Sequence, residues 1–313
     1  MKFRATYGLI GNDAIGSDSD RFFYLSQVSI GDGGYGSTFG YDYGYNRPGV
    51  SVSRYANHEI SWEESRQINL GLDISFMNNS ISIIADAYKD YKSHILEPRS
   101  HIASTIGLQA TPMSNTGKVE KQGFDLAVEY NKSLSTGWFF QYRGNVTFAQ
   151  SKITKRDELL YPEHMRYRYQ VGHSAAQEFG LIAERLFIDE YEVSNSPIQQ
   201  FGDYMAGDVK YRDMNGDEMI TWNDAVPIGY PTSPELIYGF GGTTGFKGLD
   251  FSFFFQGSGQ SSFFINPENI TPFVRNGGAQ NGLLTAIADS HWSEENRNMY
   301  AMFPRLSDYF VNN

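Results

Sequence analysis

The feature that most constrains the fold of this chain is a regular alternation of apolar and polar residues over long segments. It is clearest between residues 66 and 76. The apolar positions there are Ile68, Leu70, Leu72, Ile74 and Phe76, and the positions between them are Gln67, Asn69, Gly71, Asp73 and Ser75. Because successive side chains of a β-strand point to opposite faces, this period of two predicts a long strand with one apolar and one polar face.

Short turns join segments of this kind in pairs. Asn78 and Asn79 separate the first segment from a returning one that ends near residue 95, and Asn tolerates the left-handed backbone of a tight turn. Residues 119–131 and 138–149 flank the linker SLSTG at 133–137, and residues 236–246 and 249–256 flank Lys247 and Gly248. Residues 1–12 have the pattern of a further strand. The sequence therefore predicts an all-β protein with about seven antiparallel strands.

Long connections alternate with these short turns. They comprise residues 96–117, residues 153–234 and the segment from 258 onward, and they are rich in Gly, Pro, Asn and Asp. Long strands with short turns at one end and long loops at the other are typical of a transmembrane β-barrel of the outer membrane. A soluble β-sandwich with one solvated face per sheet produces the same alternation, so it stays open as an alternative.

The polar positions of these strands suit a hydrated barrel lumen better than a dry core. They include Gln67, Asn69, Asp73, Asp125, Glu129, Gln141, Arg143 and Asn145. Aromatic residues near the strand ends are candidates for girdles at the membrane interfaces, although ordinary sheet packing explains each of them equally well. These candidates are Trp62, Tyr88, Tyr91, Trp138 and Phe139.

Composition narrows the class of protein further. The 313 residues are 15 % aromatic and include 32 Gly, yet mean hydropathy is −0.43 and no apolar run has the length of a membrane helix. A net charge of −11 without a Lys or Arg cluster argues against nucleic acid as a partner. There is no cysteine, which excludes disulfides and thiolate chemistry. Residues 1–12 lack the features of a signal peptide, and we expect the chain to be a fragment.

The segment DMNGDEMITWND, residues 213–224, has the ligand spacing of a calcium loop. The six positions that would bind the ion are Asp213, Asn215, Asp217, Met219 through its carbonyl, Thr221 and Asp224. Glu218 stands where the sharp turn of such a loop ordinarily requires Gly, and Asp224 is shorter than the usual Glu. A structural Ca²⁺ is therefore a candidate, and an Asx-rich turn without an ion is the alternative.

The other motifs predict no catalytic site, and we expect no enzyme activity. GDGGYG at 31–36 is not followed by a helix and is interpreted as an aromatic-rich loop, not a dinucleotide site. The histidines, which are His58, His94, His101, His164, His173 and His291, are not at zinc-binding spacings. Aromatic residues in GYDYGYN and SFFINPENITPF are predicted either to stack on sugars or to pack on a partner protein, or else to pack the loops on themselves.

Four stretches closely resemble the SusC/RagA family of TonB-linked outer-membrane transporters. They are FRATYGLIGN at 3–12, EESRQINLGLDISFMNNSISIIADAYKDY at 63–91, NTGKVEKQGFDLAVEY at 115–130 and AGDVKYRDMNGDEMITWNDAVPIGYPTSPELIYGFGGTTGFKGLDFSFFFQGSG at 206–259. The resemblance runs through nearly the whole chain. The family usually has D-x-N-G-D-G in the acidic turn, so Glu218 departs from its pattern and puts the metal site in doubt.

The resemblance implies that residues 1–313 are part of a large TonB-dependent receptor β-barrel, without the plug domain and the final strands. It further implies import of bulky nutrients, typically oligosaccharides and sometimes peptides, across the outer membrane of Bacteroidetes. The implied partners are a SusD-like lipoprotein, the TonB complex, outer-membrane lipid and the transported substrate. No cofactor is required by this function, and the substrate-binding residues remain unassigned.

Two further expectations concern orientation and the alternatives. The turns at 78–79, 133–137 and 247–248 are predicted to face the periplasm, and residues 11–60, 96–117, 153–234 and 258–313 are predicted to form outward loops. A soluble carbohydrate-binding sandwich and a surface adhesin are the competing functions.

Overall fold

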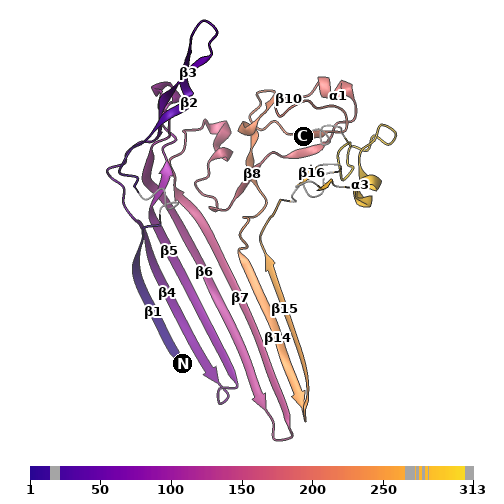
Figure 1. Ribbon diagram of the computed structural model, residues 1–313. Coiled ribbons are helices and arrows are strands. Elements are labelled where there is room, and N and C mark those ends of the chain that lie inside the picture. The colour runs from indigo at the N-terminus through magenta and orange to yellow at the C-terminus, as the bar shows by residue number, and fades with distance from the viewer. Residues whose placement is uncertain (15–21, 265–271, 273–274, 277–278, 281, 307–313) are drawn as a thin grey trace. The chain divides into compact units, whose positions relative to one another are not determined.

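The structure is a computed structural model that describes residues 1–14, 22–264, 272, 275–276, 279–280 and 282–306 (Figure 1). The chain forms two compact units. The first comprises residues 1–160, 169–176 and 233–261, and the second comprises residues 161–168, 177–232 and 262–313. Each unit is described by itself below.

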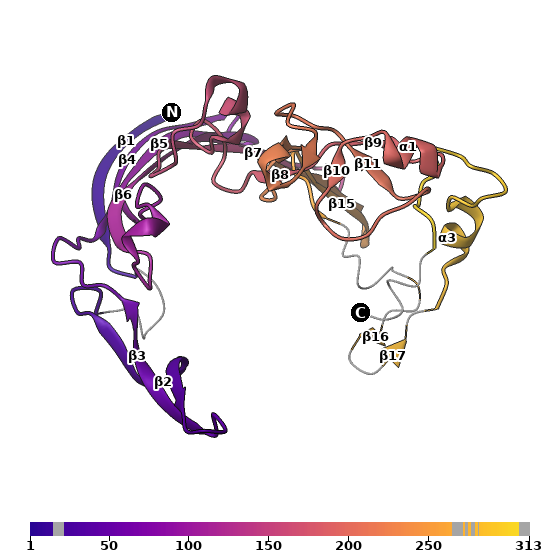
Figure 2. The same cartoon turned by 90° about the horizontal axis from the view of Figure 1, so that it is seen from above.

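A seven-stranded antiparallel sheet dominates the first unit, and its order is β1-β4-β5-β6-β7-β14-β15. Seen from above, its strands follow a curve (Figure 2). The strands are β1 (Lys2–Asn12), β4 (Glu63–Phe76), β5 (Ile81–Pro98), β6 (Met113–Ser133), β7 (Trp138–Lys155), β14 (Leu236–Phe246) and β15 (Leu249–Gly259). The all-β fold and its long antiparallel strands are therefore confirmed.

Short turns join consecutive strands at one end of this sheet, as predicted, and the longer connections leave from the other end (Figure 1). Met77, Asn78 and Asn79 all have positive φ, between 55° and 63°, which is the left-handed backbone that a tight turn requires. Lys247 and Gly248 adopt φ of 47° and 92° in the turn between β14 and β15. Asn and Gly therefore occur in these turns because they adopt the left-handed backbone conformation more readily than other residues.

The strand register gives the sheet two chemically distinct faces. One cross-strand row on the first face is apolar in every strand: Phe3, Leu72, Ala85, Leu126, Val146, Tyr238 and Gly257. The neighbouring row on the second face is Arg4, Gly71, Asp86, Asp125, Thr147, Ile237 and Ser258. We call these the apolar face and the polar face. By register, the eight polar positions predicted for a lumen all lie on the polar face.

The predicted girdle residues divide between the two faces. Tyr91 and Trp138 lie in rows of the apolar face, as a lipid-facing girdle requires, whereas Tyr88 and Phe139 lie in rows of the polar face. The girdle interpretation is wrong for Tyr88 and Phe139, because they differ from their apolar-face neighbours by one position and a strand reverses sides at each residue. Trp62 precedes β4 and packs beside Gly11.

Residues 27–54 form a β-hairpin, so the interpretation of 31–36 as a loop is wrong. Strand β2 (Gln27–Phe39) pairs antiparallel with β3 (Tyr45–Arg54), and the hairpin extends from the end of the sheet that carries the long connections (Figure 1). Its register shifts three times, between Gln27 and Val28, Ile30 and Asp32, and Asp32 and Ser37. These irregularities interrupt the alternation that marks a strand in the sequence.

The second unit has its own small core within the segment predicted to be a long loop. Phe187, Ile220 and Asp224 are its most deeply buried side chains, and Leu186 and Trp292 are also buried. Its strands are β8 (Glu178–Gly180), β9 (Ala183–Leu186), β10 (Ile198–Gln199), β11 (Val209–Tyr211), β12 (Met219–Ile220), β13 (Val226–Ile228), β16 (Arg275–Asn276) and β17 (Ala279–Gln280). They form two-stranded sheets.

Short helices complete the structure. The α-helices are α1 (Glu190–Ser194) and α3 (Thr285–Ser290), and the 3₁₀ helices are η2 (Ser104–Ile106), η3 (Glu163–Arg168) and η4 (Trp222–Asp224). None of the helices in the described ranges has the length and apolar character needed to cross a bilayer.

Candidate functional site: a two-faced sheet and an acidic loop

An ion-pair cluster occupies the polar face where β1, β4 and β5 meet. The Arg4 guanidinium donates through Nη2 to Asp73 Oδ1 at 2.7 Å and to Asp86 Oδ2 at 2.9 Å. Gly71, the register partner of both Arg4 and Asp86, provides the space: a Cβ there would lie 2.8 Å from Arg4 Cζ. A side chain at Gly71 would therefore break the cluster.

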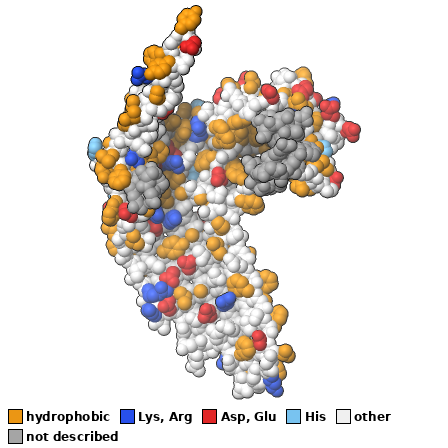
Figure 3. Space-filling view, viewed as in Figure 1, with side chains coloured by type: hydrophobic (Ala, Val, Ile, Leu, Met, Phe, Trp, Pro, Cys, Tyr) orange, Lys and Arg blue, Asp and Glu red, His pale blue; other side chains and the backbone are white. Residues whose placement is uncertain are grey.

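Charges of both signs are distributed over the rest of the polar face. Asp125 is the register partner of Asp86 on β6, and Glu129 is the register partner of Arg143 on β7. Figure 3 shows acidic and basic side chains over the strands, interspersed with hydrophobic side chains and with uncharged side chains and backbone. Such a mixed surface is compatible with water or with a polar ligand, and not with lipid.

A hollow on the polar face combines a cation, hydroxyl groups and aromatic side chains. It has a volume of about 390 Å³ and lies over two cross-strand rows of β7, β14 and β15. The Arg143 guanidinium stacks on the Phe254 ring with Cζ 5.0 Å from the ring centroid. Beside them the hydroxyls of Thr243 and Ser252 share a hydrogen bond of 2.9 Å. These groups can hold a polar ligand by hydrogen bonds and stacking.

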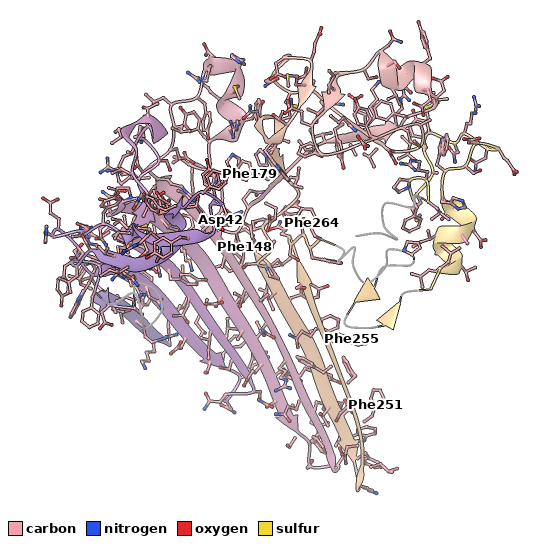
Figure 4. All side chains as sticks on the ribbon, turned by 45° about the horizontal axis from the view of Figure 1, so that its top comes forward. Asp42, Phe148, Phe179, Phe251, Phe255 and Phe264 are labelled. Carbon is pink, nitrogen blue, oxygen red and sulfur yellow. The ribbon has the colours of Figure 1, made fainter. Side chains whose placement is uncertain are left out.

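The apolar face is exposed along the sheet. Leu70, Phe124 and Phe240 keep 56 %, 45 % and 51 % of their surface, and Phe251 and Phe255 keep 70 % and 57 %. The two phenylalanines project from the same side of β15 (Figure 4). An apolar surface of this extent requires either lipid or protein against it.

Aromatic rings are concentrated on the apolar face near the short turns. The Trp138 ring stacks on Phe246 with a centroid distance of 4.6 Å and on Phe140 at 6.0 Å. Tyr130 stacks on Tyr142 across β6 and β7 at 6.3 Å. Along β7 the apolar face runs from Trp138 to Phe148. At about 3.3 Å per residue and a strand tilt of about 40°, this band is roughly 25 Å high, which matches the hydrocarbon thickness that a barrel spans.

The acidic loop forms a turn in which backbone N–H groups surround the carboxylates. Asp213 Oδ1 accepts from Gly216 N at 2.7 Å, and its Oδ2 accepts from Glu218 N at 2.9 Å. Asn215 Oδ1 accepts from Asp217 N at 3.0 Å, and Asp217 Oδ1 accepts from Met219 N at 2.9 Å. Glu218 adopts φ of 63°, so this position does need a left-handed residue, as the spacing predicts.

Asp224 is a buried acceptor that closes the loop. Its side chain is fully buried, Oδ1 accepts from the N–H groups of Met214 and Asn215 at 2.9 and 3.4 Å, and Oδ2 accepts from Thr221 N at 2.9 Å. The Thr221 hydroxyl caps η4 by accepting from Asn223 N at 3.0 Å. Met219 lies in β12, paired with Ile198. The loop is therefore held together by its own hydrogen bonds.

A metal site at residues 213–224 would require side-chain oxygens that converge on one point. Within the described ranges no group of three His, Asp or Glu side chains is arranged to hold a metal ion. Asn215 turns its Nδ2 donor toward Asp217 Oδ2 at 2.8 Å, which is hydrogen bonding within the turn. Calcium at 213–224 thus stays a prediction that the hydrogen bonds of this turn do not require.

Sequence reasoning missed the charged centre of the second unit, which is Glu192 on α1. Its carboxylate accepts from Arg185 Nη1 at 2.9 Å, from Lys210 Nζ at 2.9 Å and from Ile188 N at 3.1 Å. Burial alone would raise the pKa of Glu192, but these donors outweigh burial and lower the pKa to about 2. The partners are far apart in the sequence, so no local spacing marks this centre.

A second cluster of this kind joins two connections of the first unit. Asp157 accepts from Arg99 Nε at 2.7 Å and from the ring of His101, and its backbone N–H donates to Glu97 Oε1 at 2.9 Å. Burial raises the pKa of Asp157, yet the hydrogen bonds from Arg99 and His101 outweigh this effect and the pKa is lowered overall. His101 is thus a loop residue with a structural partner.

The predicted loop aromatics are exposed where the structure describes them. Tyr41 and Tyr43 at the tip of the β2–β3 hairpin keep 105 % and 74 % of their surface, and Phe263 and Phe264 keep 85 % and 64 %. Most of the remaining SFFINPENITPF segment lies outside the described residues.

Comparisons with known proteins agree with this geometry. Residues 27–166 match the profile of the family described as TonB dependent receptor-like, beta-barrel. The chain is 25 % identical to TonB-dependent receptor P26 of Formosa agariphila over 95 % of its length, and 23 % identical to TonB-dependent receptor SusC of Bacteroides thetaiotaomicron over 100 %. It covers 29 % and 30 % of these two relatives, so it spans about three-tenths of their length.

Solved structures of the RagAB peptide importer have the same fold over 99 % of the chain. The closed-closed and open-open states give TM-scores of 0.59 and 0.60, each at 17 % sequence identity, and the chain covers 32 % and 31 % of those proteins. The two-faced antiparallel sheet, the matched profile and these relatives all point the same way. Residues 27–166 are a TonB-dependent receptor-like β-barrel region, and the chain resembles TonB-dependent receptors such as SusC along nearly its whole length.

Proposed function

We propose that this chain is part of the wall of an outer-membrane importer for bulky nutrients, which are oligosaccharides or peptides. The observation that carries the proposal is the register of the seven-stranded sheet, which separates a continuous apolar face from a polar face. In a membrane barrel the first face contacts lipid and the second lines the lumen. The expected location is therefore the outer membrane of a Gram-negative cell of the Bacteroidetes type.

The partners proposed for the complete protein are a SusD-like lipoprotein at the outer surface and the TonB complex as the energy source. The name of the relative SusC, a TonB-dependent receptor, supports the TonB complex, and the SusD-like lipoprotein follows from the resemblance to the SusC/RagA family. Residues 1–313 would belong to the barrel domain of such a protein, with the plug domain and the final strands contributed by other parts of it. The role is transport and not catalysis.

An experiment on the complete parent protein tests this function. The gene is deleted in its native host and restored with an affinity-tagged copy, and uptake of labelled oligosaccharides and of labelled peptides is measured in each strain. We expect the tagged protein in the outer-membrane fraction, a heat-dependent change of its electrophoretic mobility as for folded barrels, and loss of uptake of one substrate class after deletion.

The competing functions predict different results. In a soluble carbohydrate-binding sandwich a second sheet would pack on the apolar face, and the protein would purify as a folded monomer without detergent. A surface adhesin would reside in the outer membrane, but its deletion would leave uptake of both substrate classes unchanged. Either result would contradict the importer.

A further inference from the structure

The apolar face carries a cluster of cationic side chains at the end remote from the short turns. Two adjacent rows of that face contain it: Ile68, Lys89, Gln122 and Gln150 in the first, and Arg66, Tyr91, Glu120 and Lys152 in the second. We call Arg66, Lys89 and Lys152 the basic rim. They come from β4, β5 and β7, so the rim extends across four neighbouring strands of one sheet.

The carboxylate within these rows is already engaged. Lys89 Nζ lies 2.5 Å from Glu120 Oε1, and the same ammonium stacks on the Tyr91 ring at 4.9 Å from its centroid. Arg66 and Lys152 are exposed, and neither forms an ion pair with another residue in the described ranges. Two positive charges therefore flank a neutralised pair and remain available for an anion.

The position of the rim is set by the rows beside it. The next rows toward the short turns are apolar across the sheet, beginning with the row of Leu70, Ala87 and Phe124. On β4 to β7 the rim therefore lies where the apolar band ends and polar side chains begin, whereas on β1 the exposed Tyr7 and Leu9 continue the apolar side chains into these rows. At the boundary of a bilayer, lysine and arginine place their aliphatic stems against the apolar region and their charged groups among lipid headgroups.

We propose that the basic rim binds the phosphate groups of lipid headgroups in the outer leaflet. The argument rests on the proposed function, since it requires the apolar face to contact lipid, and its choice of leaflet rests on the predicted outward direction of the long connections. Charge complementarity identifies the ligand: guanidinium and ammonium groups donate to phosphate oxygens, and the apolar band directly beneath accommodates the acyl chains of the same molecule. A headgroup without net negative charge, such as zwitterionic phosphatidylcholine, would neutralise the positive charge of Arg66 and Lys152 only in part.

The test uses the complete parent protein in nanodiscs of phosphatidylcholine with added monophosphoryl lipid A, with lipid binding quantified by native mass spectrometry. The variant is R66Q/K152Q. The matched control is Lys121→Gln, because Lys121 lies on β6 between the two rim rows in sequence but on the polar face. We expect the double variant to lose about 20- to 30-fold in lipid A affinity, since each charge near an anionic surface contributes about five-fold.

The control and phosphatidylcholine binding should stay unchanged, and inorganic phosphate should compete only weakly. Equal lipid A affinity in the double variant and the parent would overturn the proposal, as would an equal loss in Lys121→Gln or displacement of the lipid by inorganic phosphate at millimolar concentration. Failure of the protein to enter the outer membrane, measured by fractionation in the same strains, would refute the importer and the rim together. A correctly inserted protein with unchanged lipid binding would refute the rim alone.

Discussion

The ring of Tyr142 on β7 lies directly over Gly242, its register partner on β14. A Cβ at Gly242 would overlap Tyr142 Cδ1, so the glycine makes the space that the ring fills. The Tyr142 hydroxyl reaches on to the Thr244 hydroxyl at 2.7 Å. The same relationship recurs three residues further along β14 on the other face, where the Phe139 ring covers Gly245. These aromatic-glycine pairs pack β14 closely against β7.

The first prediction follows from this pairing. Gly242→Ala in the complete protein should lower the free energy of unfolding by about 1–3 kcal/mol, because the added methyl group displaces the Tyr142 ring. Gly144→Ala is the matched control on the same face, since its nearest neighbouring atom would be 3.8 Å away. The control should be neutral or slightly stabilising. Urea unfolding followed by electrophoretic mobility gives both values, and equal values would contradict the pairing.

The second prediction concerns the pH dependence of the second unit. The pKa of Glu192 is lowered from 4.5 to about 2 in the folded protein, so the folded state favours the ionised carboxylate. This contribution to stability is fully present above pH 4.5 and is lost as the pH falls toward 2. Limited acid proteolysis across residues 177–232 should therefore accelerate over that range.

Substitution identifies the group responsible. Glu192→Gln should destabilise the second unit by about 1–3 kcal/mol at neutral pH and flatten the acid dependence, because Arg185 and Lys210 lose their shared partner. Glu184→Gln removes the more exposed pair with Arg212 and should cost less than about 1 kcal/mol. An unchanged acid profile in Glu192→Gln would assign the transition to another group.

The third prediction concerns the acidic loop. Asp224→Ala should destabilise the second unit by about 2–4 kcal/mol with or without calcium, because it removes a buried acceptor of three backbone N–H groups. Thermal melting of the complete protein in calcium or in chelator measures this. The same experiment tests the predicted ion: a calcium-dependent shift that disappears in Asp213→Ala would support it, and indistinguishable responses would leave a hydrogen-bonded turn.

The fourth prediction concerns orientation. The short turns should face the periplasm and the β2–β3 hairpin should face outward, so a membrane-impermeant maleimide on intact cells should label Tyr43→Cys and not Ser135→Cys. Permeabilised cells should label both positions. Labelling of Ser135→Cys alone in intact cells would reverse the orientation.

The long strands could be predicted from the sequence because their signals are local. The bounds of β14 agree with the alternation from Leu236 to Phe246, and the Lys247-Gly248 turn marks its end. The β2–β3 hairpin escaped prediction because its register shifts break the period of two. The strands of the second unit could not be predicted because β8 to β13 are only two to four residues long, which is too short to show an alternation of apolar and polar residues.

In the candidate sites, too, local features could be predicted from the sequence and contacts between distant residues could not. The spacing in 213–224 identified the residues of the turn and the need for a left-handed conformation at Glu218, but not the burial of Asp224, which depends on packing of the second unit. The partners of Arg4 are 69 and 82 residues away in the chain, and only the register brings them together. Contacts of this kind have no sequence signature in a single chain.

The central claim is that one face of the sheet contacts lipid and the other does not. Nitroxide labels at successive cysteine substitutions along β6 and β7 of the complete protein in liposomes test it most directly, through collision rates with oxygen and with a polar nickel complex. Leu126→Cys and Val146→Cys should favour oxygen, whereas Asp125→Cys and Asn145→Cys should not. Equal ratios at adjacent positions, or the opposite alternation, would contradict the account.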